Sequence, residues 1–227
     1  MRVGIIGAGQ IGALVAELLT KAGHVVALSH RGSLGSLGTR VAALGSRARA
    51  ATVEETCDFA EVVMLAIPWR NREDLPARRL RRKIAIDAMN PYRPDFGLYD
   101  LGDSTSSEEV AKALPGTRLV KAFNSLRASD LASLGRKDRP VAERIALPIA
   151  GDDAAAKRRV AKLVVEVGFA PVDTGSLRQG GRLQEPGGPF FGRAVSGADA
   201  SAAMRRAAEA RHEAALGVGQ RPGDSWS

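Results

Sequence analysis

The sequence predicts an α/β fold built on a doubly wound parallel sheet. Two observations predict it. Short apolar runs, each suited to a buried parallel strand, alternate with segments of helical periodicity along most of the chain. The first such run leads through closely spaced glycines into a helix and a second strand, all within about 30 residues. Strands separated by helices throughout form a parallel sheet with right-handed crossovers.

The first strand–helix–strand unit is the clearest part of the pattern. Residues 2–6 form an apolar run that suits a buried strand, and residues 25–29 form a second one. Between them, apolar residues recur at the spacing of a helix that packs on a sheet: Ile11, Leu14, Val15, Leu18, Leu19 and Ala22. Gly23 follows as the C-terminal cap. We therefore expect the first helix to connect two strands of one sheet.

The remaining elements follow in the same alternation. We expect strands near residue 52 and at residues 62–67, 84–87, 118–122, 145–150 and 169–172. We expect helices at residues 34–44, 107–114, 129–134 and directly after Asp152 or Asp153, either of which can cap a helix. The basic residues 70–83 are typical of one solvated helix face, although Arg70 or Arg72 could steer a charged ligand.

The composition changes at about Gly175. Glycines and prolines over residues 180–189 predict loops, and residues 200–216 predict an Ala-rich helix. We expect residues 217–227 to be disordered. The chain is therefore expected to consist of a domain of residues 1–175 and a C-terminal segment, residues 176–227, that serves as a lid or as the arm of a homodimer.

Composition and charge limit the classes of function. The 227 residues are 44% apolar and 26% charged, which suffices for one substantial core. A single cysteine, Cys57, excludes an internal disulfide and fits a reducing compartment, so we expect a cytoplasmic protein. No run of about 18 uncharged apolar residues is present, so we expect no membrane span. The net charge of +8 indicates an anionic partner, and with only 4% aromatic residues a small anion is favoured over nucleic acid.

The glycines after the first strand have the spacing GxGxxG, as Gly7, Gly9 and Gly12. At such positions the first glycine permits a tight turn, the second lets the backbone approach a pyrophosphate, and the third allows close packing of helix and sheet. The helix N-terminus adds amide donors and a favourable dipole. Because the motif follows a strand and opens an amphipathic helix, it predicts dinucleotide binding by a Rossmann-type sheet.

The end of the second strand favours NADP over NAD. NAD enzymes place Asp or Glu about 20 residues beyond the glycines, where it accepts a hydrogen bond from the ribose 2′-hydroxyl. This chain has Ser29, His30 and Arg31 there, with Ser33 close by and no carboxylate. A guanidinium beside a hydroxyl suits a 2′-phosphate, so we expect NADP as the cofactor. His30 either stacks on the adenine or faces water.

Ligands of open α/β sheets bind at the carboxyl ends of the strands. Three candidate segments lie there: Ala66-Ile67-Pro68-Trp69, Met89-Asn90-Pro91 and Ala122-Phe123-Asn124-Ser125. Asn90 and Asn124 are each either ligand contacts or ordinary loop asparagines. The three histidines and Cys57 lie in no pattern that suggests a general base, a nucleophile or a metal site. We therefore expect no catalytic residue and no metal, which suits hydride transfer, where the protein mainly supplies orientation.

Several of these segments, taken together, resemble the family of NADP oxidoreductases that depend on the deazaflavin coenzyme F420. They also resemble the cytosolic reductase domain of the six-transmembrane metalloreductases. The segments are residues 7–12, 29–31, 67–69, 120–124, 148–153 and 168–177, so that the resemblance covers about residues 1–177. Family members often carry further basic residues after the position of Arg31, where this chain has residues 32–35, Gly-Ser-Leu-Gly.

The resemblance implies a role for each matching position. The pyrophosphate would bind at Gly7, Ala8, Gly9, Gln10 and Ile11, and the 2′-phosphate at Ser29 and Arg31. Ile67, Pro68 and Asn90 would line the nicotinamide ribose, and Ala122, Phe123 and Asn124 would face the nicotinamide ring and the acceptor. In such enzymes hydride passes directly between two stacked rings, so no residue acts as an acid or a base.

The sequence therefore predicts an oxidoreductase that moves hydride between NADP(H) and a planar redox acceptor, first of all coenzyme F420. A reductase of a flavin, a ferric chelate or a small imine or carbonyl compound is the alternative enzyme. About 50 residues after the sheet are few for a substrate domain, which counts against an imine or carbonyl substrate. A non-catalytic redox sensor that binds NADP and regulates a partner is the alternative outside enzymes.

Overall fold

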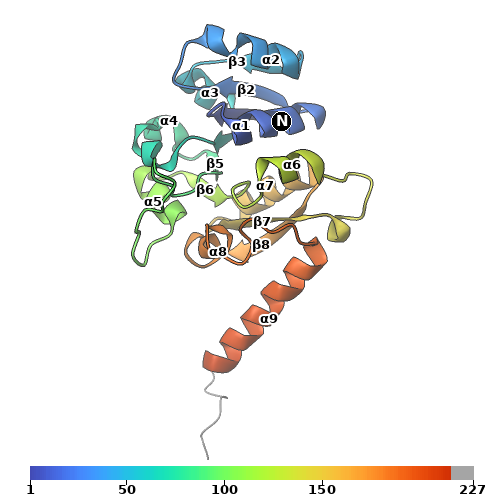
Figure 1. Cartoon of the computed structure of the whole chain (residues 1–227). Coiled ribbons are helices and arrows are strands. Elements are labelled where there is room, and N and C mark those ends of the chain that lie inside the picture. The colour runs from blue at the N-terminus through green and yellow to red at the C-terminus, as the bar shows by residue number, and fades with distance from the viewer. Residues whose placement is uncertain (216–227) are drawn as a thin grey trace, which may run out of the picture.

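The computed structural model describes residues 1–215, and within this range eight strands form one sheet in the order β3-β2-β1-β4-β5-β6-β7-β8 (Figure 1). The strands are β1 (Arg2–Ile6), β2 (Val25–Ser29), β3 (Ala48–Ala50), β4 (Val62–Leu65), β5 (Ile84–Asp87), β6 (Arg118–Lys121), β7 (Ala146–Gly151) and β8 (Ala170–Gly175). The α-helices are α1 (Gln10–Lys21), α2 (Gly38–Leu44), α3 (Val53–Phe59), α4 (Ala77–Leu80), α5 (Ser106–Ala113), α6 (Ala128–Ser133), α7 (Ala154–Glu166), α8 (Leu177–Gln184) and α9 (Gly197–Ala215). The predicted α/β class is confirmed.

The first six strands have the order 3-2-1-4-5-6 that is typical of dinucleotide-binding sheets. They all run parallel, so their carboxyl ends meet at one edge. The expectation of a wholly parallel sheet is wrong at one place, because β7 pairs antiparallel with β6, Val120 opposite Gly151 and Lys121 opposite Ala150. The chain enters β7 at the edge where β6 ends, whereas a parallel pair would need a crossover back to the opposite edge.

Several predicted elements differ in their bounds. The strand expected near residue 52 lies at β3, and Thr52 instead caps α3, a helix that the sequence did not predict, in a capping box with Glu55. The predicted helix over residues 34–44 is a 3-10 helix, η1 (Leu34–Leu37), followed by α2. The basic segment is two short helices, η2 (Trp69–Asp74) and α4, because Leu75 and Pro76 interrupt it. A third 3-10 helix is η3 (Val141–Glu143).

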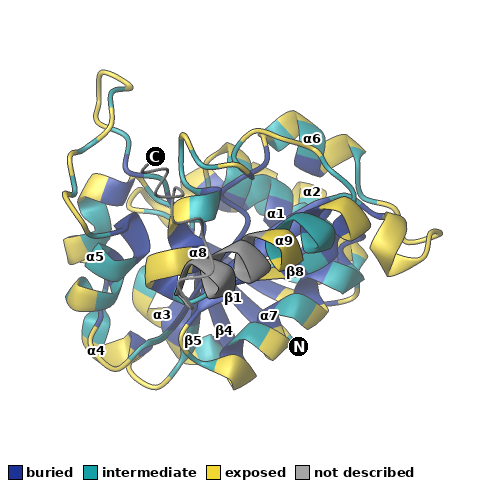
Figure 2. Ribbon diagram, turned by 90° about the horizontal axis from the view of Figure 1, so that it is seen from below, coloured by how far each residue is buried: buried dark blue, intermediate teal, exposed yellow. Residues whose placement is uncertain are grey.

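The sheet is buried between two hydrophobic clusters, one on each face (Figure 2). The helices α1 and α7 supply the apolar stripes of one cluster: Val15, Ala16 and Leu19 from α1, and Ala156, Val160, Leu163 and Val164 from α7. The other cluster takes Cys57 from α3, Leu80 from α4 and Val110 from α5. Burial on both faces explains why the strand sequences are continuous apolar runs.

The C-terminal segment continues from the sheet without a break. α8, which lies where the sequence predicted loops, packs on β7 and β8, and α9 begins against β8 and extends away from the sheet (Figure 1). The predicted helix over residues 200–216 corresponds to α9, whereas the expectation for residues 217–227 lies outside the described residues. No helix within residues 1–215 combines the length and the apolarity that crossing a membrane requires.

Candidate functional site

The glycine turn between β1 and α1 is shaped by close backbone contacts. Gly7 has a φ of +112°, and a Cβ atom there would overlap the carbonyl oxygen of Ala66. A Cβ atom at Gly12 would overlap the carbonyl oxygen of Gly7. At Gly9 a Cβ atom would meet nothing within 4 Å. The first and third glycines are therefore required by packing, and the second faces open space.

The N-terminus of α1 has the properties of an anion site. Its N-cap is Gly9, no side chain accepts from the first-turn N–H groups, and no acidic residue lies in the first turn. These amides have no partner within the helix, and the helix dipole places partial positive charge there. An anion that approaches over Gly9 would meet free donors and no side chain.

A cavity of about 540 Å³ lies on one side of this turn. It is bounded by the end of β2, by α2 and by η2. The predicted site residues that line it are Gly7, Ala8, Gly9, His30, Arg31, Ala66, Ile67 and Pro68. The structure thus brings the glycine turn, the end of β2 and the loop after β4 together at one edge of the sheet. Ile67 and Pro68, which were expected at the nicotinamide ribose together with Asn90, line the same cavity as Arg31, whereas Asn90 does not line it.

Two arginines face this first cavity. Arg31 forms an ion pair with Asp74 of η2, and Arg40 of α2 donates to the carbonyl oxygen of Ala8. The sequence reasoning missed Arg40, although the predicted helix over residues 34–44 contained it, because the pattern did not show which way that helix would face. Arg40 supplies in space the second basic side chain that is absent directly after Arg31.

The residues around Arg31 lie differently from the prediction. The hydroxyl of Ser29 is fully buried and donates to the carbonyl oxygen of Ile5 at 3.2 Å, so it is not free for a phosphate. Ser33 does not line the cavity either. The His30 ring lines it, with Nδ1 accepting from the Gly32 amide at 2.9 Å and Nε2 2.8 Å from the Ser36 hydroxyl. His30 therefore fixes its own loop.

A second cavity, of about 440 Å³, lies on the other side of the turn. It is lined by Gln10, Ile11, Ala88, Asn90, Asn124, Ser125, Leu126, Arg127, Ala128, Phe191, Gly192 and Arg193. Ala8 and Gly9 thus face the first cavity, and Gln10 and Ile11 face the second. An elongated ligand lying across the N-terminus of α1 would reach both.

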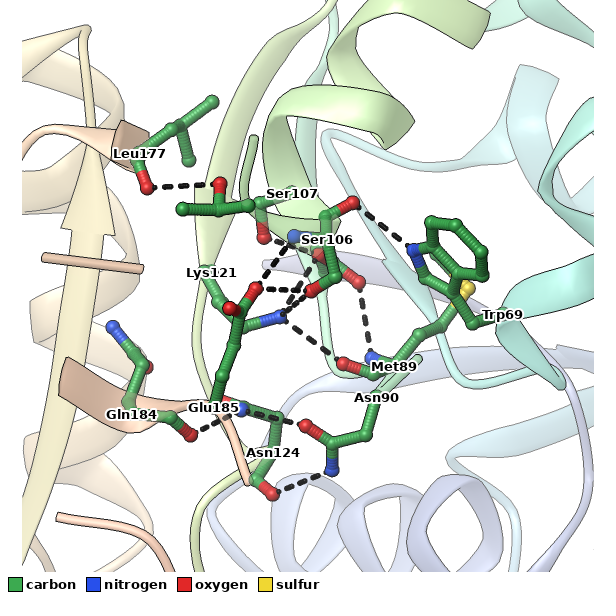
Figure 3. A network of polar contacts seen from close by, with 12 residues as sticks. Trp69, Met89, Asn90, Ser106, Ser107, Lys121, Asn124, Leu177, Gln184 and Glu185 are labelled. Atoms are coloured by element: carbon green, nitrogen blue, oxygen red, sulfur yellow. Dashed lines mark hydrogen bonds and ion pairs between the residues drawn. The ribbon is translucent and has the colours of Figure 1, made fainter. Parts of the chain in front are cut away.

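Asn90 and Asn124 hold each other at the second cavity (Figure 3). The Asn90 amide donates to the carbonyl oxygen of Asn124 at 3.0 Å, and the Asn124 amide donates to Asn90 Oδ1 at 3.0 Å. The Asn124 amide also donates to the carbonyl oxygen of Gln184 at 2.7 Å. The pair therefore joins the loops after β5 and β6 to the end of α8.

Comparison with known proteins identifies the family to which this chain belongs. Residues 2–91 match the family described as NADP oxidoreductase, coenzyme F420-dependent. By these residues the chain belongs to this family. The F420-dependent NADP oxidoreductase match includes the glycine turn, the first cavity and Asn90, and it ends before β6.

Three similar proteins show over how much of its length this chain resembles known proteins. The protein SMa0349 of Sinorhizobium meliloti is 32% identical, with a TM-score of 0.78, over 86% of this chain and 95% of that one. Metalloreductase STEAP3 of Rattus norvegicus is 30% identical over 178 residues. These residues are 78% of this chain but only 34% of STEAP3, so this chain spans about a third of the length of STEAP3. A candidate F420-dependent NADP reductase of Arthrobacter sp. FB24 is 22% identical, with a TM-score of 0.72, over 86% and 99%, and shares the fold.

Two of the three positions expected to face the nicotinamide ring and the acceptor lie in the core. Ala122 and Phe123 are buried in the core and do not line the second cavity. Phe123 has a φ of +64°, which is unusual for a bulky residue. This left-handed residue turns the chain so that Phe123 packs inward and Asn124 reaches the cavity. Such strain concentrates at functional sites.

Residues 1–215 offer little support for a metal site or a nucleophile. No group of three or more His, Cys, Asp or Glu residues that could hold a metal ion occurs within residues 1–215. Burial raises the pKa of the Cys57 thiol to about 11, so this side chain stays neutral near neutral pH and is a poor nucleophile. The two cavities beside the glycine turn are therefore the candidate site.

Proposed function

We propose that this protein binds NADP(H) across the N-terminus of α1 and transfers hydride to a planar heterocyclic acceptor, coenzyme F420 in the first place. The observation that carries the proposal is the arrangement of the two cavities on opposite sides of one glycine turn. The adenosine end of the dinucleotide would lie in the first cavity, its pyrophosphate over Gly9, and its nicotinamide end toward Asn90 and Asn124.

The residues present suit a phosphorylated dinucleotide. The uncapped first turn of α1 offers amide donors, and the open space at Gly9 lets a pyrophosphate approach the backbone. Arg31 and Arg40 offer two guanidinium groups for a 2′-phosphate. Asp74 pairs with Arg31 in the structure and would have to give up that contact for the phosphate.

The second cavity suits an acceptor that needs no protein acid. Its lining residues are amides, apolar side chains, one serine and two arginines, with no Asp, Glu, His, Cys, Tyr or Lys among them. When bound, NADPH would supply the hydride and leave as NADP⁺, while a heterocyclic acceptor would take one proton from water. Reduction of a carbonyl or imine commonly uses a side-chain proton donor, which this lining lacks. The lining therefore favours a planar redox cofactor.

The test is anaerobic stopped-flow mixing of the protein and NADPH with coenzyme F420, following the absorbance of both compounds. We expect equimolar NADPH oxidation and F420 reduction. If NADPH binds but F420, flavins and ferric chelates are all left unreduced, the proposal is contradicted. That result would support a non-catalytic redox sensor.

A second candidate is reduction of a flavin or a ferric chelate, because the chain is 30% identical to metalloreductase STEAP3 over 178 residues. The same experiment separates the two candidates. FMN and ferric chelates are offered under conditions matched to those for F420. A higher kcat/KM for FMN or the chelate than for F420 would favour this second candidate.

We also propose that α9, in the C-terminal segment of residues 176–227, is the arm of a homodimer. The start of α9 packs in a small apolar cluster that contains Ala200, Phe190 and Val172, and the helix then extends away from the sheet (Figure 1). A hollow beside this start has seven apolar lining residues and three charged ones: Leu183, Pro189, Phe190, Val195, Ala200, Ala203 and Met204, with Arg193, Asp199 and Arg206. Sedimentation equilibrium should give a dimer for the full chain, and a monomeric full chain would contradict the arm.

A further inference from the structure

Lys121, which belongs to a buried ion pair, lies near the Asn90 and Asn124 pair (Figure 3). Lys121, the last residue of β6, places Nζ 3.3 Å from Oδ2 of Asp87, the last residue of β5, and neither side chain is exposed. The same ammonium donates to the carbonyl oxygen of Met89 at 3.1 Å and to the Ser106 hydroxyl at 3.0 Å. Each of its three N–H donors therefore has an acceptor.

The pair holds both peptide groups of Met89. Asp87 Oδ1 accepts from the Met89 amide at 3.0 Å, and Lys121 donates to the Met89 carbonyl oxygen. Asp87 Oδ2 also accepts from the Ser107 hydroxyl. Because the chain is fixed on both sides of Met89, the next residue, Asn90, leaves in a defined direction toward the second cavity.

The same network reaches the end of α8. Glu185 Oε1 accepts from the Ser106 amide at 2.6 Å and from the Ser106 hydroxyl, which in turn accepts from Lys121. The neighbouring residue, Gln184, accepts from Asn124 through its carbonyl oxygen. Lys121 is thus connected to Asn90 through Met89 and to Asn124 through the end of α8.

Stability alone does not account for a lysine at this position. Removing two charges from water offsets most of their attraction, so a buried ion pair is often no more stabilising than apolar side chains of similar volume. The neighbours of Lys121 in β6, Leu119 and Val120, are buried apolar residues. A fully satisfied polar network instead specifies one arrangement of the loops that it joins.

We infer that Lys121 is a positioning residue for the nicotinamide and acceptor end of the site. It lines neither cavity, and it acts by fixing Met89 and the end of α8, and through them the Asn90 and Asn124 amides. The inference rests on the proposed function for the identity of the ligands, whereas the network itself is independent of it.

The test replaces Lys121 by methionine, which keeps the length of the side chain and removes the ammonium. Lys112→Met is the matched control, because Lys112 lies on α5, close to the network in sequence, and is exposed. Three quantities are measured: hydrogen exchange of the peptides that contain residues 88–92 and 182–186, NADPH affinity by titration of its fluorescence, and hydride transfer with normal and deuterated NADPH.

We expect faster exchange in both peptides of the Lys121→Met variant and NADPH affinity within about twofold of the wild type, because the first cavity is untouched. We expect kcat to fall about ten- to hundredfold, the size of effect that misplacement by about 1 Å produces, and the primary isotope effect to rise because hydride transfer becomes slower than the other steps. The control should leave all of these values unchanged.

A Lys121→Met protein of lower melting temperature but wild-type kcat and isotope effect would overturn the inference and leave Lys121 a structural residue. Should that variant not fold, Ser106→Ala removes one link of the network with little loss of volume and should change the same quantities in the same direction. If the wild type transfers no hydride, the proposed function fails, and hydrogen exchange decides the inference: unchanged exchange of residues 88–92 overturns it.

Discussion

Asp74 should weaken NADPH binding, and Asp74→Asn should strengthen it. In the structure the carboxylate pairs with Arg31 at the rim of the first cavity, and both side chains are largely exposed, Arg31 by 63% and Asp74 by 58%. Breaking such an exposed pair costs about 0.2–1 kcal/mol. A 2′-phosphate bound at Arg31 would also lie close to Asp74. A phosphate monoester carries about −1.5 to −2 charges, and unit charges about 4 Å apart in water repel by about 1 kcal/mol.

After screening by salt, the two effects together amount to about 1–2 kcal/mol, or roughly a 5- to 30-fold gain in NADPH affinity. NADH has a neutral hydroxyl at this position, so its affinity should change less. The assay is isothermal titration of both nucleotides at two salt concentrations. Asp58→Asn is the matched control. The Asp58 side chain is 58% exposed, as Asp74 is, and it pairs with an arginine, Arg79, but it does not line the first cavity. An unchanged ratio of NADPH to NADH affinity in Asp74→Asn would refute the assignment of Arg31 to the 2′-phosphate.

Three further predictions concern the glycine turn, pH and one helix cap. Gly12→Ala should lower the free energy of unfolding by about 1–3 kcal/mol, because its Cβ atom would overlap the backbone. Gly9→Ala should keep the melting temperature of the wild type and weaken NADPH binding. Equal melting temperatures of the two variants would contradict this. Burial lowers the pKa of His24 below 6.5, although Glu166 opposes the shift, so the unfolded state binds more protons and stability should fall as pH drops below about 6.5. The urea midpoint of unfolding should depend less on pH in the His24→Gln variant than in the wild type. Thr52→Ala should lower the free energy of unfolding by about 0.5–2 kcal/mol through loss of a capping box, without changing NADPH affinity.

Arg31 and Arg40 show the limit of local reasoning at the first cavity. The absence of a carboxylate after β2 and the presence of Arg31 were visible in the sequence, whereas Asp74 lies 43 residues further along and meets Arg31 only in the fold. Arg40 faces the turn because of the way α2 packs. Ser29 looked available as a phosphate contact, but a hydroxyl in a buried strand bonds to a carbonyl of the neighbouring strand, here Ile5.

The sequence by itself determined the alternation of strands and helices, the glycine turn and the start of α1 directly after it. These features depend on residues a few positions apart, whose spacing sets the period and the backbone conformation. Only the tertiary structure decided the reversal of β7, the inward turn at Phe123, and the network that joins Lys121, Asp87 and Glu185. Such contacts depend on which strand ends and helix ends become neighbours, and no local pattern encodes the partner of a side chain that lies dozens of residues away.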